Sequence, residues 1–174
     1  MTALPLRNVT VVEMGTFITG PAAGMLLADL GAKVIKIEQP ETGDPFRAFK
    51  GGLYSPHYQT YNRNKQSVTL DTRKAEDLAE LDRLVASADV FIQNFRPGVA
   101  GRLNVDADRL RGINPRLVYC SITGFGHSGP RAHQPGYDLM VQGMSGLMSV
   151  TGERDDLGGG PQKVGVAVAD LFTG

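Results

Sequence analysis

With 174 residues, 41% of them hydrophobic and 21% charged, the chain has the length and composition of one globular domain with a buried core. Its 18 Lys and Arg residues balance 18 Asp and Glu residues, which argues against broad electrostatic binding to nucleic acid or to an anionic membrane surface. The single cysteine, Cys120, excludes an internal disulfide and is typical of a reducing compartment.

The first forty residues predict a βαβ unit. Val9–Glu13 is a short, β-branched run typical of a buried strand, and Gly15–Pro21 is a glycine-punctuated turn. Pro21 suits the first position of a helix over Ala22–Leu30, and Lys33–Glu38 forms the next strand. Two strands joined by a helix in so short a segment indicate parallel pairing with a right-handed crossover.

Strands and helices continue to alternate after this unit. Gln39–Lys50 is rich in Pro, Gly and charge and predicts a loop, whereas Tyr54–Lys65 shows no clear periodicity. Helices are predicted at Lys74–Ala88, from its amphipathic spacing, and near Asp106–Arg111. Further strands are predicted at Ser67–Asp71, Asp89–Phe95 and Leu117–Thr123. The fold class is therefore α/β, with an open, mainly parallel, Rossmann-like sheet and flanking helices.

The last forty residues predict a helix, a loop and an acid in an apolar run. Gly136–Val150 places Tyr137, Met140, Met144 and Leu147 on one helical face, and a loop over Glu153–Gly160 follows. The final run, Lys163–Gly174, is apolar except for its basic first residue and one carboxylate, Asp170. Burying an unpaired acid is costly. Asp170 therefore either caps or salt-links the start of a helix, or faces a cleft as a reactive group.

Two glycine-rich turns could mark a ligand site. Gly124–Gly129 matches G-x-G-x-x-G, but Pro130 and Arg131 follow it, so no helix starts there to bind a pyrophosphate. We interpret it as a loop at the carboxyl edge of a strand. The earlier turn is either a tight turn with close helix–sheet packing or a cleft wall where Phe17 and Ile18 face an acyl group.

Several kinds of site are not supported. The three histidines lack i, i+4 partners and no Cys-x-x-Cys is present, so no metal site is predicted, and the Gly-x-Ser-x-Gly motif of serine hydrolases is missing. Cys120 lies in an apolar run and is interpreted as a core residue. Carboxylates and arginines remain as candidate reactive and anion-binding groups. Without a visible signal peptide or an apolar run of about 18 residues, we expect a soluble, cytoplasmic protein.

The order and spacing of several segments resemble class III CoA-transferases, the family of formyl-CoA transferase and the carnitine and bile-acid CoA-transferases. The matching segments are Gly20–Pro21, Leu30–Glu38, Asn62–Lys65, Leu70–Asp71, Gln93–Gly98, Asn114–Pro115, Gly124–Gly126, Pro135–Asp138 with Gln142, and Val164–Gly174. The resemblance implies a Rossmann-like large domain plus a small domain, in a homodimer of interlocked chains. Residues 1–174 would be the N-terminal part of the large domain, without the small domain, the returning C-terminal segment and its glycine-rich loop.

The resemblance also implies the chemistry. Asp170 matches the catalytic aspartate, whose carboxylate attacks an acyl-CoA thioester and then carries coenzyme A as an aspartyl thioester to a small carboxylic acid. No tightly bound cofactor is implied, since coenzyme A enters as substrate. Positions matching coenzyme A contacts are Asn94 and Phe95 beside the pantetheine arm and thiol, Arg102 at the phosphates, Leu70 at the adenine, Arg73 where relatives have lysine, and Tyr137 near the nucleotide end. Gln39 departs from the pattern, because formyl-CoA transferase has an arginine there.

Two alternatives remain beside the transferase. The α-methylacyl-CoA racemases of the same family use a His in a Gly-His-Asp motif, where this sequence has Gly136-Tyr137-Asp138. Tyrosine is a poor base for an α-proton, which favours the transferase. The second alternative is a truncated, inactive chain that binds coenzyme A or only associates with other chains, since a chain ending at Gly174 is expected to leave apolar surface uncovered.

Overall fold

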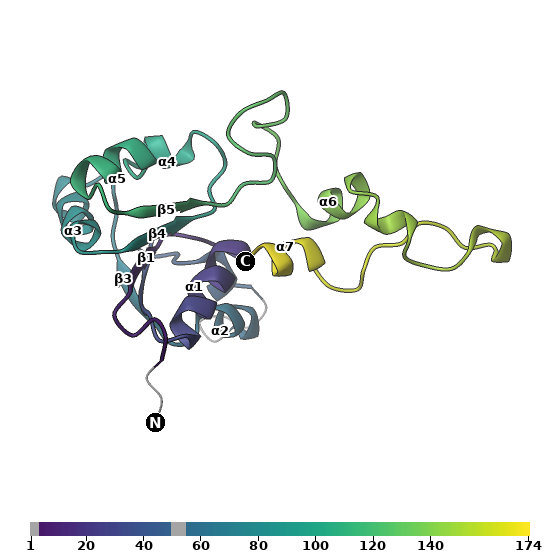
Figure 1. Ribbon diagram of the computed structural model, residues 1–174, viewed down its shortest axis with the longest axis horizontal. Coiled ribbons are helices and arrows are strands. Elements are labelled where there is room, and N and C mark those ends of the chain that lie inside the picture. The colour runs from purple at the N-terminus through teal and green to yellow at the C-terminus, as the bar shows by residue number, and fades with distance from the viewer. Residues whose placement is uncertain (1–3, 50–54) are drawn as a thin grey trace.

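Five parallel strands form the centre of the fold in the computed structural model, which describes residues 4–49 and 55–174. The strands are β1 (Thr10–Glu13), β2 (Lys33–Glu38), β3 (Lys65–Thr69), β4 (Val90–Gln93) and β5 (Val118–Ser121). Their order is β3-β2-β1-β4-β5 (Figure 1). The strands β2 and β3 are thus added on one side of β1, and β4 and β5 on its other side. Such a reversal places the ligand crevice of an α/β sheet at the carboxyl ends of the two central strands. The predicted fold class is confirmed.

Helices cover both faces of the sheet. One face carries α1 (Thr19–Asp29) and α2 (Pro56–Asn62), and the other carries α3 (Ala75–Ala86), α4 (Val99–Arg102) and α5 (Ala107–Ile113) (Figure 1). As its periodicity predicts, α3 buries Leu81 and Val85 completely. The start of α5 is capped by the Asp106 carboxylate, which accepts a hydrogen bond from the backbone N–H of Arg109 at 3.1 Å.

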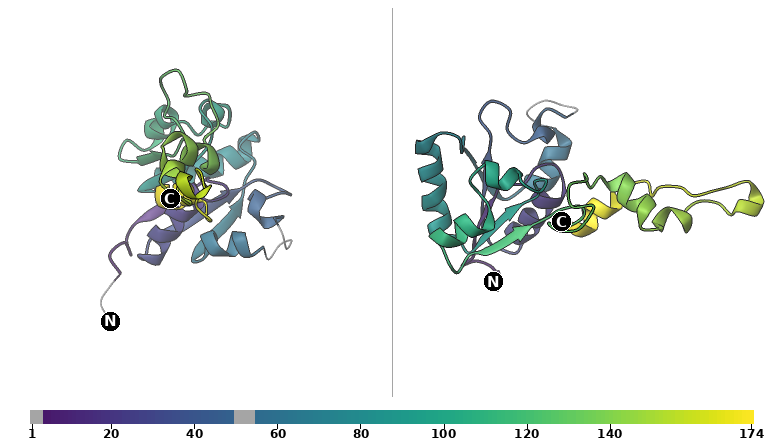
Figure 2. Two further views of the ribbon diagram at one scale, coloured as in Figure 1. Left: turned by 90° about the vertical axis from the view of Figure 1, so that its right-hand side faces the viewer. Right: turned by 90° about the horizontal axis from the view of Figure 1, so that it is seen from above.

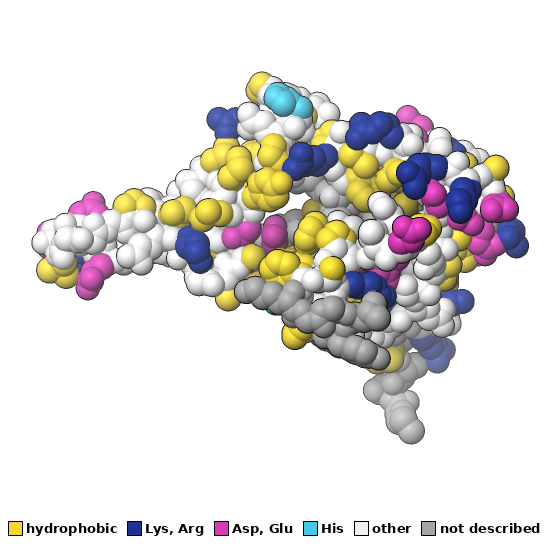
Figure 3. All heavy atoms as spheres, turned by 180° about the vertical axis from the view of Figure 1, so that it is seen from behind, with side chains coloured by type: hydrophobic (Ala, Val, Ile, Leu, Met, Phe, Trp, Pro, Cys, Tyr) yellow, Lys and Arg dark blue, Asp and Glu magenta, His cyan; other side chains and the backbone are white. Residues whose placement is uncertain are grey.

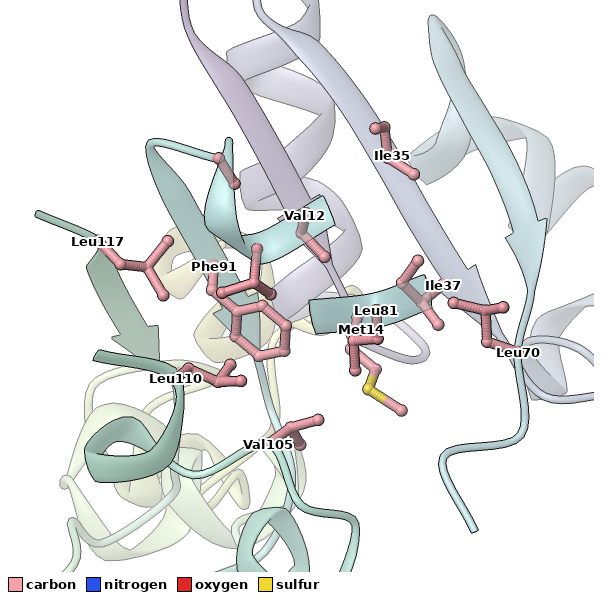
Figure 4. Packing of buried hydrophobic residues seen from close by; sticks show 12 residues of the cluster. Val12, Met14, Ile35, Ile37, Leu70, Leu81, Phe91, Val105, Leu110 and Leu117 are labelled. Atoms are coloured by element: carbon pink, nitrogen blue, oxygen red, sulfur yellow. The ribbon is translucent and has the colours of Figure 1, made fainter. Parts of the chain in front are cut away.

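Two clusters of buried hydrophobic side chains join the helices to the sheet. The larger lies under α3 and α5 and is centred on Phe91, which is fully buried and stacks on Tyr119 with ring centroids 5.5 Å apart (Figure 4). The smaller lies on the α1 face and joins Val11, Ala28, Ala32, Val34 and Ile92. Cys120 packs against this second cluster, and burial raises the pKa of its thiol, which supports a packing role over a nucleophilic one.

After β5 the chain leaves the sheet and forms an arm, residues 138–167, which projects away from the body (Figures 1 and 2). The arm contains α6 (Asp138–Met144) and the 3-10 turns η3 (Leu147–Ser149) and η4 (Asp155–Leu157). The chain then returns through α7 (Val168–Thr173), whose end rests against Thr19 and Ala22 of α1. Within the described residues, no helix combines the length and apolarity that crossing a bilayer requires.

The first helix and the third strand depart from their predicted boundaries. The helix begins at Thr19, so Pro21 is its third residue and not its first. The reason is that the whole first turn lacks intrahelical acceptors for its N–H groups, so proline fits anywhere within it. The third strand is Lys65–Thr69 and not Ser67–Asp71, because its ladder ends where Thr69 pairs with Glu38, the last residue of β2.

Other departures concern segments that have no strong local pattern. The helix α4 was not predicted. The 3-10 turn η1 (Pro45–Arg47) was not predicted either, and it lies inside the expected loop over Gln39–Lys50. The helix expected over Gly136–Val150 stops at Met144, since Gly146 takes the left-handed φ of 82° that ends helices. Most of Tyr54–Lys65 is α2, while its first residue and Lys50 lie outside the described residues.

Candidate active site

The site forms at the switch point, where the turn after β1 meets the turn after β4. Asn94 joins the two turns with its side chain. Its Oδ1 accepts a hydrogen bond from Thr16 N at 2.9 Å, and its Nδ2 donates to Thr16 O at 2.8 Å and to Thr19 Oγ1 at 2.9 Å. Both polar ends of Asn94 therefore hold the turn that leads into α1.

The glycines of the first turn allow its backbone to fold onto itself. A Cβ on Gly15 would lie 2.9 Å from the Cα of Gly20, and a Cβ on Gly20 would lie 3.3 Å from the Asn94 amide. Phe17 takes a positive φ of 61°, and its ring packs edge-on against Phe46 at 5.2 Å. The tight turn with close packing is confirmed, and Phe17 and Ile18 line a cavity. That they face an acyl group stays a prediction.

A buried ion network lies behind this turn. The Lys36 ammonium, 1% exposed, lies 2.8 Å from Glu13 Oε1 and 3.0 Å from Asp44 Oδ2, and donates to Gly15 O at 2.8 Å. Burial alone would lower the pKa of Lys36, but attraction to the two carboxylates outweighs this effect and raises the pKa. Lys65 lies 2.6 Å from Glu13 Oε2, yet burial dominates there and lowers the pKa of Lys65 to about 8. The network fixes the strand ends below the site.

A second polar cluster surrounds Glu38 at the end of β2. Its carboxylate accepts hydrogen bonds from Arg47 Nε at 2.6 Å and Arg47 Nη2 at 2.7 Å, and from the hydroxyls of Tyr58 at 2.9 Å and Ser67 at 2.5 Å. The backbone N–H of Asp44 donates to it at 2.9 Å. Although burial favours the neutral acid, these donors together lower the pKa of Glu38 to about 2.

A cavity of about 630 Å³ opens at the switch point, between the sheet body and the arm. Asn94, Phe95, Tyr137 and Asp170 line it, so four of the seven predicted site residues meet there. Figure 3 shows hydrophobic side chains on both sides of the hollow where the arm joins the body. Among the described lining residues, the charged side chains are Asp170 and Arg96.

Asp170 is the third residue of α7 and is half-buried at this cavity. Burial raises its pKa, and the negative charge of Asp138 raises it further. Among the described residues, no hydrogen-bond donor or cation is paired with its carboxylate. The first turn of α7 is capped instead by Asp138, whose Oδ1 accepts a hydrogen bond from Ala169 N at 2.8 Å. Of the two interpretations left open by the sequence, the helix cap is not seen, because Asp138 takes that place, and Asp170 lines the cavity. That it is a reactive group stays a prediction.

Arg96 and Tyr137 form the opposite part of the lining. The Arg96 guanidinium donates to the Tyr137 hydroxyl at 2.9 Å and lies 5.9 Å from the centre of its ring. Both side chains are exposed, so a ligand can reach the cation. The sequence reasoning missed Arg96, although it lies in the Gln93–Gly98 segment that carried the resemblance.

A neighbouring cavity of about 670 Å³ shares Thr16 and Phe95 with the first. Gln39, Glu38 and Arg47 line it, so it lies over the Glu38 cluster. Gln39, which departs from the family pattern in the sequence, therefore lines open space beside the candidate site.

The remaining predicted contacts lie outside both cavities. Arg73 is exposed and pairs with Asp71, 2.8 Å from Nε to Oδ1. Arg102 ends α4 and is exposed. Leu70 is 6% exposed and belongs to the larger hydrophobic cluster, so its side chain supports the sheet. Within residues 4–49 and 55–174, no three His, Cys, Asp or Glu side chains gather as a metal site would require.

Comparison with known proteins shows the family of the chain. The family model for CoA-transferase family III matches residues 6–174. The succinate–glutarate CoA-transferase of Agrobacterium fabrum is 48% identical over 98% of this chain and 44% of its own length. The acetyl-CoA:oxalate CoA-transferase of Acetobacter aceti is 42% identical over 98% of this chain and 44% of its own.

A solved structure shows the same fold. The crystal structure of a CAIB/BAIF family protein from Brucella suis superimposes with a TM-score of 0.91 at 46% identity, over 99% of this chain and 46% of that one. The chain thus spans slightly less than half the length of these relatives.

Proposed function

The chain belongs to CoA-transferase family III, and we propose that the protein containing it transfers coenzyme A from an acyl-CoA donor to a carboxylic acid through intermediates on Asp170. The observation that carries this proposal is the environment of Asp170. Its carboxylate lines the switch-point cavity, is half-buried, and is paired with no donor among the described residues. A desolvated carboxylate with a raised pKa is a stronger nucleophile than a solvated one.

The reaction proceeds by two pairs of acyl substitutions. An Asp170 oxygen attacks the donor thioester carbon, and the C–S bond breaks to give a mixed anhydride and coenzyme A thiolate. The thiolate attacks the Asp170 carbonyl carbon, which releases the donor acid as a carboxylate and leaves an aspartyl-CoA thioester. The acceptor carboxylate attacks this thioester, and its C–S bond breaks to give a second anhydride and coenzyme A thiolate. The thiolate then attacks the acceptor's carbonyl carbon, which forms the product thioester and releases the Asp170 carboxylate. The anhydride conserves the reactivity of the thioester throughout.

Water must be excluded while the anhydride exists, or it hydrolyses. The lining offers apolar groups for this purpose, including Phe17, Ile18, Phe95 and Val141. The exposed hydrophobic residues of the arm and of α7, among them Leu139, Val150 and Phe172, indicate that further protein covers this side. A homodimer, as the family resemblance implies, is part of the proposal.

For coenzyme A, the proposal places the thiol end beside Asn94 and Phe95 and the rest of the molecule along the carboxyl edge of the sheet. Tyr137 lies close to this path, and Gln39 lines the neighbouring cavity. Arg102, Arg73 and Leu70 lie beyond the two cavities. Arg102 and Arg73 are exposed cations that suit phosphate groups outside the enclosed part of the site.

For the acids exchanged, we propose short dicarboxylic acids. Succinate and glutarate, named for one relative, and oxalate, named for the other, are all of this class. One carboxylate of such a substrate reacts at Asp170, and the other needs a cation. Arg96 is the cation that lines the cavity in the described part of the chain, and it is oriented by Tyr137.

Replacing the nucleophile tests the proposal. In the full-length protein, Asp170→Asn is expected to lower CoA transfer by about 1,000-fold or more, since covalent catalysis is lost. Hydroxylamine added with acyl-CoA should convert Asp170 of the wild type to a hydroxamate, seen by peptide mass spectrometry, and leave the variant unmodified. The control is Asp155→Asn, an exposed position on the arm.

Three results would argue against the proposal. An active Asp170→Asn variant would remove Asp170 from the chemistry. A hydroxamate on another residue would place the intermediate elsewhere. Exchange of the α-proton of a 2-methylacyl-CoA for deuterium, without CoA transfer, would identify the racemase instead.

A further inference from the structure

We propose that Asp138, held by Gln142, is a positioning residue that fixes the start of α7 so that the Asp170 carboxylate faces the cavity. This inference rests on the proposed role of Asp170 as nucleophile. It concerns a contact between two segments of the arm, α6 and the chain leading into α7, which lie side by side (Figure 1).

The start of α7 depends on a carboxylate from another helix. The residue before α7 is Ala167, which has no side-chain acceptor for the free N–H groups of the first turn. Asp138 supplies it from α6, 32 residues away from Asp170 along the chain. Its Oδ1 accepts from Ala169 N at 2.8 Å and from Asp170 N at 3.4 Å. One of these two N–H groups belongs to the nucleophile itself.

Gln142, one turn after Asp138 on α6, extends this clamp. Its Nε2 donates to Asp138 Oδ2 at 2.5 Å and to Val166 O at 3.3 Å, and its Oε1 accepts from Val164 N at 2.9 Å. Gln142 is only 1% exposed, so these bonds are shielded from water. Asp138 and Gln142 together hold the backbone from residue 164 to residue 170.

Little else fixes this end of the helix. α7 has six residues, none of them buried, and a helix so short is marginal without outside contacts. Its far end rests on α1, where a Cβ on Gly174 would lie 2.6 Å from the Ala22 Cβ. Its near end is held by Asp138 and Gln142. Since an attacking atom must approach within about 3–3.5 Å of the thioester carbon, loosening this end would misplace the nucleophile.

The charge of Asp138 has a second effect. The ionisable groups around Asp170 are Asp138 from α6, with Tyr137 and Arg96 on the cavity wall, while the facing residues of α1 are uncharged. A neighbouring anion makes Asp170 a more basic carboxylate. The same residue therefore orients the nucleophile and strengthens it.

Two substitutions separate these effects in the full-length protein. Asp138→Ala removes both the cap and the charge, and it is expected to lower kcat about 100-fold with little change in KM for acyl-CoA. Asp138→Asn keeps an oxygen for Ala169 N but turns an amide toward Gln142 Nε2, so a loss of about 10-fold is expected. Because the anion is gone in both, the acid limb of the kcat–pH profile should move to lower pH.

The matched control is Asp106→Ala. Asp106 caps α5 in the same way, by accepting from Arg109 N at 3.1 Å, but it lies away from both cavities. The control should lower the melting temperature and leave kcat per folded molecule unchanged. Activity is normalised to folded protein by circular dichroism.

The outcomes distinguish this inference from the proposed function. If Asp170→Asn is inactive while Asp138→Ala keeps wild-type kcat and pH profile, the positioning role fails and the nucleophile stands. If Asp106→Ala lowers kcat as strongly as Asp138→Ala, the effect is general destabilisation and the inference also fails. If Asp138→Ala does not fold, Asp138→Asn decides, because an unmoved acid limb with unchanged kcat contradicts the proposal.

Discussion

Glu38→Gln should destabilise the protein in a strongly pH-dependent manner. The carboxylate is 5% exposed and accepts five hydrogen bonds, two of them from Arg47. Its pKa falls from 4.5 to about 2 on folding. At about 1.36 kcal/mol per pKa unit, this shift corresponds to about 3 kcal/mol of folding free energy. The amide cannot take the charge, so the variant should lose about this amount near neutral pH.

The direction of this pH dependence follows from the lowered pKa of Glu38. The contribution is fully present above pH 4.5, where the carboxylate is ionised in both states, and it is lost as pH falls through about 2. Urea unfolding followed by circular dichroism at pH 7, 5 and 3 should therefore show a gap in the free energy of unfolding between wild type and variant. This gap should narrow as the pH falls. Glu76→Gln, an exposed site on α3, is the control and should show no such gap. A gap that is equally wide at pH 7 and pH 3 would refute the electrostatic reasoning.

Two further predictions concern α1 and the cavity. Gly24→Ala should lower the free energy of unfolding by about 2 kcal/mol, because the new methyl group would overlap the buried Glu13 carboxylate. The control Gly112→Ala in α5, which has open space around it, should raise the free energy of unfolding by up to about 1 kcal/mol. Equal shifts of the two variants in thermal melts would contradict the predicted overlap. Arg96→Met should raise KM for a dicarboxylic acceptor at least about 10-fold and leave KM for a monocarboxylic acceptor nearly unchanged, measured by initial rates of acyl-CoA formation. Equal effects on both acceptors would remove Arg96 from dicarboxylate binding.

The sheet could be predicted because local sequence patterns indicate its strands. Each of β1, β2 and β4 contains adjacent β-branched or other apolar residues, and the glycine turn and helix between β1 and β2 imply parallel pairing. The ends of the strands were harder to predict, because they depend on the register with the neighbouring strand. Thr69 ends β3 only because β2 ends at Glu38. The four residues of α4 are too few to show a helical period.

The site was only partly predictable, because its contacts join distant positions. Asn94 binds Thr16 across 78 residues, and no local pattern distinguishes this bond from an ordinary turn. Asp138 lay in a segment that carried the family resemblance, but its role depends on α6 and α7 lying side by side. The helical face with Met140 and Met144 was expected, whereas its exposure was not, since periodicity says nothing about what covers a face.

The buried Glu38 and the half-buried Asp170 show why environment, not residue type, identifies the candidate nucleophile. Glu38 has five donors around it, so its charge is stabilised and its pKa is lowered to about 2, which makes it a weak base held in place. Asp170 has burial and a neighbouring anion and no donor among the described residues, so its pKa is raised. Folding therefore stabilises the charge of one carboxylate and disfavours the charge of the other, which is the environment expected of a functional acid. An acyl-CoA thioester entering the switch-point cavity would meet the proposed nucleophile, because Asp170 lines that cavity and the stabilised Glu38 lines the next one.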